Sequence, residues 1–256
     1  VLSPLNKRGD YVNYDMFLFH GHGEGDCGAC ANGYKEVDLA KDLTKKVYDL
    51  LINRGVKVLT NLENGYNNYN RNLTSGHNIK YKMGCSIHFN SASETAVGSE
   101  IIIPCKEMYY SIENDILNGL QSLGFTNRRV KSRDYDTEQW VNRKGNDKYY
   151  CTDYYKEIRN AYSNGNSLSI IEVCFITNLE DIKRYNQNKD KIAKIIANAY
   201  LREMDKSLYS LEEPKKETST IMYRVITGSF ANRENAEKRI KELKDKGFDS
   251  FIEIRK

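Results

Sequence analysis

The chain has 256 residues, of which 29% are charged and 39% hydrophobic, and its formal net charge is +4. This length allows one sizeable domain and a small appendage, and the apolar residues cluster into runs that can form a core, which excludes overall disorder. The mild charge shows no Lys/Arg cluster interleaved with aromatic residues, and no run approaches the roughly 18 apolar residues that span a bilayer, so neither a nucleic-acid groove nor a membrane span is expected.

The first predicted strand, residues 16–20, leads into the glycine-rich segment GHGEGDCGAC. Loops at the carboxyl end of a strand are where α/β sheets bind ligands. His22 stands between two glycines in this loop, and the absence of neighbouring side chains lets its imidazole reach a metal ion. His20 is the alternative, as a second ligand or as a buried histidine bonded within the strand; the glycine-flanked position favours His22.

A helix is predicted from Glu36 to Leu51, with Gly55 after its end, because apolar residues recur there at intervals of three and four. Glu36 then lies in the first turn, as a metal ligand or only as a favourable acidic residue. Residues 56–60 are predicted to form a second strand, followed by a polar loop and a short helix. Residues 85–89 form a further strand, and His88 lies near its end.

Residues 99–103 and 168–175 are predicted strands, with an amphipathic helix at residues 108–123 between them. Glu172 interrupts the second of these apolar runs. A buried carboxylate without a partner costs several kcal/mol, so Glu172 must be paired, protonated or near a metal. A structural ion pair stays open, but the position at the end of a strand favours catalysis.

Two further helices are predicted at residues 179–185 and 192–204, and they complete an alternation of strands and helices. This alternation predicts an α/β fold with three αβα layers around a mostly parallel or mixed sheet in residues 1–205. Residues 206–220 are predicted to be a linker. Residues 221–256 are predicted to be a small α+β unit with a βαβ pattern.

A catalytic zinc ion takes three protein ligands and leaves one position open for water. The chain has only four histidines, and the loop and strand positions favour His22, Glu36 and His88 as ligands. His77 is expected to be a solvated surface residue. With one zinc ion activating water, Glu172 is predicted to take the proton from water and pass it to the leaving nitrogen.

Two groups of residues carry weaker signals. The six cysteines are expected to be reduced, since three lie in apolar strand-like runs; for Cys27 and Cys30, which form a Cys-x-x-Cys, a disulfide, a redox-sensitive loop and coincidence all stay open. Four aromatic residues in loop-like stretches are candidates for lining a glycopeptide cleft, although the substrate-binding residues are not assigned. They are Tyr34, Tyr66, Tyr69 and Trp140.

Four motifs follow one another between about residues 15 and 205: GHGEGDCGA, GYKEVDLA, SIHFNS and IIEVCFITN. In this order and spacing they resemble the zinc-dependent N-acetylmuramoyl-L-alanine amidases of the amidase_3 type. The resemblance implies that His22, Glu36 and His88 bind zinc and that Glu172 is the catalytic carboxylate. It also implies cleavage between the lactyl group of N-acetylmuramic acid and L-alanine of the peptidoglycan stem peptide.

The C-terminal segment YRVITGSFANRENAEKRIKELKDKGFDSFI resembles half of a SPOR domain, a peptidoglycan-binding module. A single half leaves an unpaired sheet face, so a homodimer that pairs two C-terminal units is a hypothesis. The expected partner is peptidoglycan, through both its glycan strand and its stem peptide.

Two other functions compete with the amidase: a wall-binding protein without catalysis, and a zinc carboxypeptidase that acts on stem peptides. The intact set of four site residues favours an enzyme, and the SPOR-like segment disfavours the carboxypeptidase. An endolysin or autolysin role at the cell wall is expected, with phage, sporulation, germination and division roles all open. The opening residues lack the apolar core of a secretory signal, so cytoplasmic accumulation with release on lysis is an expectation.

Overall fold

The computed structural model describes residues 14–23, 25–62, 81–144, 149–212 and 227–254. The chain divides into two compact units, Val1–Leu211 and Glu212–Lys256. No helix within these described ranges is long and apolar enough to cross a membrane.

A seven-stranded sheet forms the middle of the first unit, in the order β4-β1-β5-β9-β6-β7-β8. Its strands are β1 (Tyr14–His20), β4 (Val58–Leu59), β5 (Tyr81–Asn90), β6 (Ser99–Ile102), β7 (Asn127–Arg133), β8 (Trp140–Asn142) and β9 (Ser169–Phe175). The pairs β6–β9 and β7–β8 are antiparallel, and the other neighbours are parallel. The sheet is therefore mixed, as the sequence predicts.

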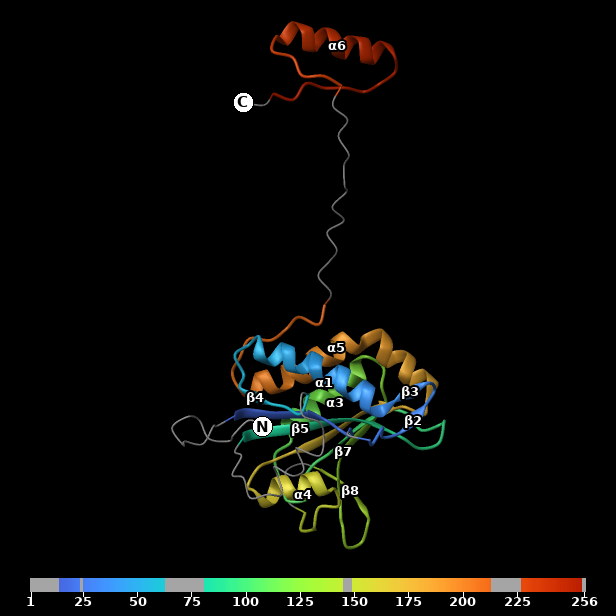
Figure 1. Ribbon diagram of the computed structural model, residues 1–256, viewed down its shortest axis with the longest axis vertical. Helices are drawn as coiled ribbons and strands as arrows, with labels where there is room; N and C mark the ends of the chain where they lie inside the picture. The colour runs from blue at the N-terminus through green and yellow to red at the C-terminus, as the bar shows by residue number, and fades with distance from the viewer. Residues whose placement is uncertain (1–13, 24, 63–80, 145–148, 213–226, 255–256) are drawn as a thin grey trace. The chain divides into compact units, whose positions relative to one another are not determined.

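Helices cover both faces of this sheet (Figure 1). The helices α1 (Glu36–Ile52), α3 (Ser111–Ser122) and α5 (Leu179–Glu203) lie on one face, and α4 (Lys156–Ser163) lies on the other. The alternation of side chains along β1 serves both layers: Met16 and Leu18 belong to the larger core, whereas Phe17 and Phe19 pack with Ala161 of α4. The predicted three-layer α/β fold is confirmed.

Several predicted elements differ from the structure. The two helices expected at residues 179–185 and 192–204 form one continuous helix, α5, because the polar residues between them include no helix breaker and face outward. The strands β7 and β8 and the helix α4 were not predicted. The sequence predicts a short helix before residue 85. This prediction is wrong for residues 81–84, which belong to β5.

A small antiparallel hairpin precedes α1 and sets the position at which this helix begins. It pairs β2 (Cys30–Ala31) with β3 (Tyr34–Lys35), and Gly33 at its turn has a φ of +79°. The backbone NH of Glu36 then donates to the carbonyl oxygen of Ala29 over 2.8 Å. Glu36 is therefore the first residue of α1 and is held against the loop that follows β1.

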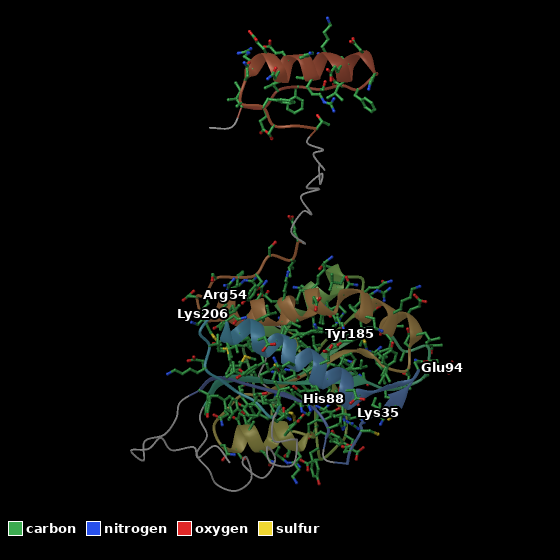
Figure 2. All side chains as sticks on the ribbon, turned by 45° about the horizontal axis from the view of Figure 1, so that its top comes forward. Lys35, Arg54, His88, Glu94, Tyr185 and Lys206 are labelled. Atoms are coloured by element: carbon green, nitrogen blue, oxygen red, sulfur yellow. A yellow bond between two sulfur atoms is a disulfide. The ribbon has the colours of Figure 1, made fainter. Side chains whose placement is uncertain are left out.

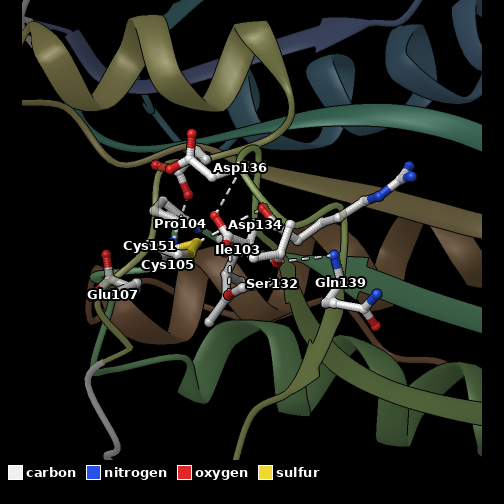
Figure 3. The surroundings of a disulfide bond; sticks show 12 residues. Ile103, Pro104, Cys105, Glu107, Ser132, Asp134, Asp136, Gln139 and Cys151 are labelled. Carbon is white, nitrogen blue, oxygen red and sulfur yellow. Dashed lines mark hydrogen bonds between the residues drawn. A yellow bond between two sulfur atoms is a disulfide. The ribbon is translucent and has the colours of Figure 1, made fainter.

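Cys105 and Cys151 form a disulfide, so the expectation that all cysteines are reduced is wrong for this pair (Figure 3). Tertiary structure brings the two together, because the segment after β6 is anchored by the NH of Cys105, which donates to Asp153 over 2.6 Å. Cys85 and Cys174 are buried free thiols, as expected.

Replacement of Cys151 by serine is expected to lower the free energy of unfolding of the first unit. The disulfide closes a loop with a sequence separation of 46, and the lost constraint on the unfolded chain corresponds to about 4 kcal/mol. Urea denaturation with and without a reductant measures the effect. Reductant should lower the stability of the wild type and leave Cys151→Ser unchanged; equal stability of both proteins without reductant would contradict the prediction.

The beginning of the predicted linker packs on the first unit. The hydroxyl of Tyr209 donates to the carbonyl oxygen of Leu50 over 2.9 Å, and the NH of Tyr209 donates to Asn198 over 2.8 Å. The guanidinium of Arg54 lies 4.1 Å from the centre of the Tyr209 ring. Figure 2 labels Arg54 and Lys206 in this region. Residues 206–211 are therefore part of this unit, and residues 213–220 lie outside the described residues.

The second unit contains the predicted helix, α6 (Arg233–Asp245), which begins after Asn232. The Asn232 side chain caps it by accepting a hydrogen bond from the NH of Glu234 over 2.8 Å. Residues 248–254 do not form the predicted strand. The other predicted strand of this unit covers residues 223–230; residues 227–230 are described and do not form a strand, and residues 223–226 lie outside the described residues. A strand needs a hydrogen-bonded neighbour.

Candidate metal centre

Three adjacent parallel strands, β1, β5 and β9, bring the candidate residues to one edge of the sheet. His20 at the end of β1 pairs with Ile87 of β5, and His88 pairs with Glu172 of β9. The carboxyl ends of parallel strands meet at the same edge, which is the usual place for a ligand site. The register therefore places His88 and Glu172 side by side and the loop that carries His22 next to them.

His22 has an unusual backbone conformation, with a φ of 63°. A residue other than glycine rarely adopts a positive φ, and such strain is found where a side chain must be directed at a functional site. Its Nδ1 lies 2.9 Å from a carboxylate oxygen of Asp26, and its Nε2 lies 3.1 Å from Glu36. The strained turn and Asp26 together aim the ring at Glu36.

Glu36 is the residue on which the others converge. It is only 5% exposed, and its Oε1 lies 3.1 Å from His22 Nε2 and 3.1 Å from His88 Nδ1. Oε1 also accepts from the NH of Phe89, and Oε2 accepts from the NH of Ala29. Burial alone would raise the pKa of Glu36, but hydrogen bonds from the two imidazoles hold it well below its usual value.

The pKa values of His22 and His88 shift in the opposite direction to that of Glu36. Burial would lower the pKa of His88, but the carboxylates of Glu157 and Glu36 raise it well above the usual value. The pKa of His22 is likewise raised by Glu36 and Asp26 against the effect of burial. In this arrangement, protons hold the two imidazoles and the carboxylate together, and a divalent cation among them would take the place of those protons.

The residues fit a catalytic zinc site. One ligand atom each from His22, Glu36 and His88 can be chosen so that all three lie within 4.8 Å of one another, and within the described residues no other group of His, Cys, Asp and Glu does this. Two imidazole nitrogens and one carboxylate oxygen are a typical donor set for catalytic zinc and leave a position open. The sequence proposes the same three residues, and their role stays a prediction.

Glu172 lies beside this group, as the sequence suggests. Its Oε2 is buried and has no hydrogen-bond partner among the described residues. Burial raises the pKa of Glu172 to about 8; the charge of His88 opposes this shift, and the charges of Glu36, Glu100 and Glu157 add to it. A carboxyl group with a pKa close to neutral is suited to accept and release a proton during a reaction near pH 7.

A cavity of about 310 Å³ opens on these side chains. Its lining residues are His22, Glu36, His88, Phe89, Asn90, Ser91, Tyr155, Lys156, Glu157 and Glu172. Sequence reasoning missed Tyr155, Lys156 and Glu157, which come from the start of α4. The apolar spacing of Ile158 and Ala161, both buried, was the signal that could have located this short helix.

The other candidates lie away from the metal group. His20 is buried, and its Nδ1 lies 3.1 Å from the carbonyl oxygen of Gly21, as in the alternative reading of a histidine bonded within the strand. Trp140 is 44% exposed and does not line the cavity. Tyr34 is also exposed and accepts a hydrogen bond from Asn186. His77, Tyr66 and Tyr69 lie outside the described residues.

Cys27 and Cys30 are exposed free thiols whose sulfur atoms lie 3.0 Å apart. They flank Gly28, which has a φ of +65° and packs directly against His22 and Glu36. A Cβ at Gly28 would lie 2.6 Å from His22 Cδ2 and 2.7 Å from Glu36 Oε2, so this position requires glycine.

Position 21 is also expected to require glycine, because the ring of His88 lies against it. A Cβ at position 21 would lie 2.0 Å from Cε1 and 2.3 Å from Nε2 of His88, so Gly21→Ala must displace the ring (Figure 2 labels His88). Such overpacking costs about 1–3 kcal/mol, which corresponds to zinc binding weakened roughly 10- to 100-fold. Competition with a chromogenic chelator measures the zinc affinity.

Gly25→Ala is the matched control in the same loop. Unlike Gly21, Gly25 has a positive φ, +96°, and nothing lies within 4 Å of a Cβ there. It therefore tests backbone strain without the clash. Equal zinc affinity of the two variants would contradict the proposed contact between Gly21 and His88.

Comparison with protein families gives two matches. The family described as N-acetylmuramoyl-L-alanine amidase (Amidase_3) matches residues 16–202, and the SPOR domain matches residues 194–252. The two matches overlap at residues 194–202, which belong to α5 of the first unit. No curated protein sequence matches the chain.

Solved structures share the fold. Cwp6 from Clostridium difficile is similar with a TM-score of 0.57 and 19% identity over 75% of this chain, which spans 29% of that chain. The N-acetylmuramoyl-L-alanine amidase AmiC2 of Nostoc punctiforme gives 0.53 and 20%, over 74% of this chain and 97% of that chain. The catalytic domain of CwlV from Bacillus (Paenibacillus) polymyxa var. colistinus gives 0.55 and 18%, over 75% and 98%.

Proposed function

The chain belongs to the N-acetylmuramoyl-L-alanine amidase family (Amidase_3), and on that premise we propose that it uses one zinc ion, held by His22, Glu36 and His88, to hydrolyse its amide bond in peptidoglycan. The bond joins the lactyl group of N-acetylmuramic acid to L-alanine of the stem peptide. The observation that carries the proposal is the convergence of two imidazoles and a carboxylate in a cavity that also contains Glu172.

Each residue has a distinct task in this proposal. His22 and His88 supply neutral nitrogens, and Glu36 supplies a carboxylate that is already ionised because its pKa is held low. When bound, zinc acts as a Lewis acid that makes water acidic near neutral pH and polarises a carbonyl group. Glu172 accepts the proton of the attacking water and delivers it to the nitrogen of the departing L-alanine, so no covalent intermediate is needed.

The half-buried position of Glu172, whose Oε2 is itself buried, supports this role. A carboxyl group with a pKa near 8 in the metal-free protein is more basic than an exposed glutamate. A nearby divalent cation would lower this pKa and favour the ionised form that can accept a proton. The same side chain therefore fits both the acceptance of the proton and its release.

The SPOR match supports a location at the cell wall, where the second unit would hold the enzyme near its substrate. The homodimer predicted from the C-terminal resemblance stays a prediction, and a solution mass of a single chain would contradict it. An endolysin or autolysin role also stays a prediction. A test is lysis of growing cells from outside compared with expression from within.

The deciding experiment measures the new amino groups of L-alanine that the purified chain releases from peptidoglycan. Zinc content, a chelated sample and the same sample with zinc restored are measured in parallel. We expect release that is lost on chelation and recovered with zinc. Binding to cell walls without release would favour a recognition module, and release of terminal amino acids from free stem peptides would favour a carboxypeptidase.

A further inference from the structure

Each candidate histidine ligand has one ring nitrogen that faces Glu36 and one that faces away. For His22, Nε2 lies 3.1 Å from Glu36, and Nδ1 lies 2.9 Å from Asp26. For His88, Nδ1 lies 3.1 Å from Glu36, and Nε2 lies 3.5 Å from Glu157. Both outward nitrogens therefore face a carboxylate, although the two carboxylates come from distant parts of the chain.

The contact between His88 and Glu157 lies in the interior. The side chain of Glu157 is 6% exposed and that of His88 is 13% exposed. His88 Nε2 and Glu157 Oε2 are buried polar atoms without a hydrogen-bond partner among the described residues. Leaving a buried polar atom unpaired is unfavourable, so a shift that shortens the 3.5 Å separation between His88 Nε2 and Glu157 Oε1 into a hydrogen bond stabilises the pair.

The helix α4 holds Glu157 in this place. Glu157 is in the first turn of α4, and the next residue, Ile158, packs with Ile102 and Ile170 of the sheet. Ala161, one turn later, packs with Phe17 and Phe19 of β1. The carboxylate is therefore fixed by the packing of α4 beneath the sheet rather than by a loop.

Glu157 is not placed to be a fourth metal ligand in this structure. The group whose ligand atoms lie within 4.8 Å of one another contains His22, Glu36 and His88, and Glu157 does not belong to it. Glu157 contacts the opposite corner of the His88 ring from the nitrogen that faces Glu36. Its position is behind the ligand and not at the metal.

We propose that Glu157 is a positioning residue that accepts a hydrogen bond from Nε2 of His88 and so presents Nδ1 of that ring to the metal. A neutral imidazole carries one proton on either nitrogen, and only the unprotonated nitrogen can bind a metal. A carboxylate at Nε2 selects the form that is protonated there. Histidine ligands in general are oriented by such partners, whose removal weakens metal binding about 10- to 100-fold.

The inference rests on the proposed function, because it assigns a task toward the metal that the function requires. Zinc affinity is measured by competition with a chromogenic chelator, independently of activity, for the wild type, Glu157→Gln and Glu157→Asp. We expect Glu157→Gln to bind zinc about 10- to 100-fold more weakly and Glu157→Asp to recover part of the loss. Glu107→Gln is the control, since Glu107 bonds to Ser167 and does not line the cavity.

Nitrogen NMR of the histidine-labelled, zinc-loaded wild type gives a second readout that needs no variant. We expect His88 to show a metal-bound Nδ1 and a protonated Nε2. A protonated Nδ1, or a zinc affinity of Glu157→Gln within about threefold of the wild type, would overturn the inference. Tighter zinc binding or faster turnover in Glu157→Gln would also overturn it, because Glu157 would then be a competing ligand.

The outcomes separate the two proposals. A wild-type chain that fails to bind zinc would overturn both of them. A wild-type chain that binds zinc but releases no L-alanine would overturn the proposed function and leave the task of Glu157 intact. Equal zinc affinity of an active wild type and Glu157→Gln would overturn only the inference.

Discussion

Replacement of Glu172 by glutamine is expected to lower the turnover number for peptidoglycan about 10²- to 10⁴-fold while the protein keeps its zinc. Glutamine has nearly the same shape but cannot accept a proton from water. Glu172 does not belong to the group of three ligands, so its replacement should leave the metal site intact. The release of L-alanine amino groups and the zinc content per chain are measured on the same samples.

Glu180→Gln is the control for this variant, because Glu180 is an exposed glutamate at the start of α5. It should show wild-type activity. Turnover of Glu172→Gln within a few-fold of the wild type would contradict the proton-transfer role. Loss of zinc together with activity would instead place Glu172 among the ligands.

The raised pKa of Glu172 predicts how the stability of the metal-free protein depends on pH. The pKa of Glu172 is raised from 4.5 to about 8 by burial, so the folded state binds a proton that the unfolded state has released between these values. The stabilising effect is complete below about pH 4.5 and is lost as the pH rises through 8. Metal-free Glu172→Gln should therefore be more stable than the wild type at pH 9, by roughly 2–5 kcal/mol.

Urea denaturation in the presence of a chelator measures this difference at pH 5 and pH 9. At pH 5 the wild-type carboxyl is protonated in the folded state, so the two proteins should differ little. An equal difference at both values would mean that the variant acts through packing and not through the proton on Glu172.

Replacement of Glu36 by glutamine is expected to abolish zinc binding at micromolar zinc and, with it, nearly all activity. Oε1 of Glu36 lies 3.1 Å from both ligand imidazoles, and no other carboxylate among the described residues belongs to the group. The loss should exceed the 10- to 100-fold effect of a residue behind a ligand, because Glu36 supplies a ligand atom itself. Chelator competition and metal analysis measure it.

Asp38→Asn controls for the loss of a negative charge from the first turn of α1. Asp38 is an acidic residue of the same turn but is exposed, so its replacement changes the helix dipole interaction and not the metal group. Its zinc affinity should equal that of the wild type. Glu36→Gln with full zinc content would show that Glu36 is only a favourable residue at a helix N-terminus.

The sequence indicated the strands that carry the site because their signal is local. Short apolar runs mark β1, β5 and β9; His88 and Glu172 are polar residues within two of these runs, and His22 follows the end of the third. Glu172 is recognisable because nothing else in its run is charged, and His22 because glycines flank it. These are properties of a few neighbouring residues, so sequence reasoning can reach them.

The elements that sequence reasoning missed have a weaker local signal. β7, with the sequence NRRVKSR, lies toward the edge of the sheet and lacks an apolar run. The helix α4 has only eight residues, and the sequence around it is rich in tyrosine and charge. The sequence predicted two helices in place of α5, because the polar stretch between them has no apolar pattern. This stretch remains helical because it faces solvent.

The sequence by itself determined the α/β class and the resemblance to an amidase, and it proposed the four residues His22, Glu36, His88 and Glu172, because each depends on local pattern and on the order of motifs. Only the tertiary structure decided the pairing of Cys105 with Cys151 and the position of Glu157 behind His88. Both join residues more than 40 positions apart, and their proximity depends on strand register and on helix packing, which no local pattern contains.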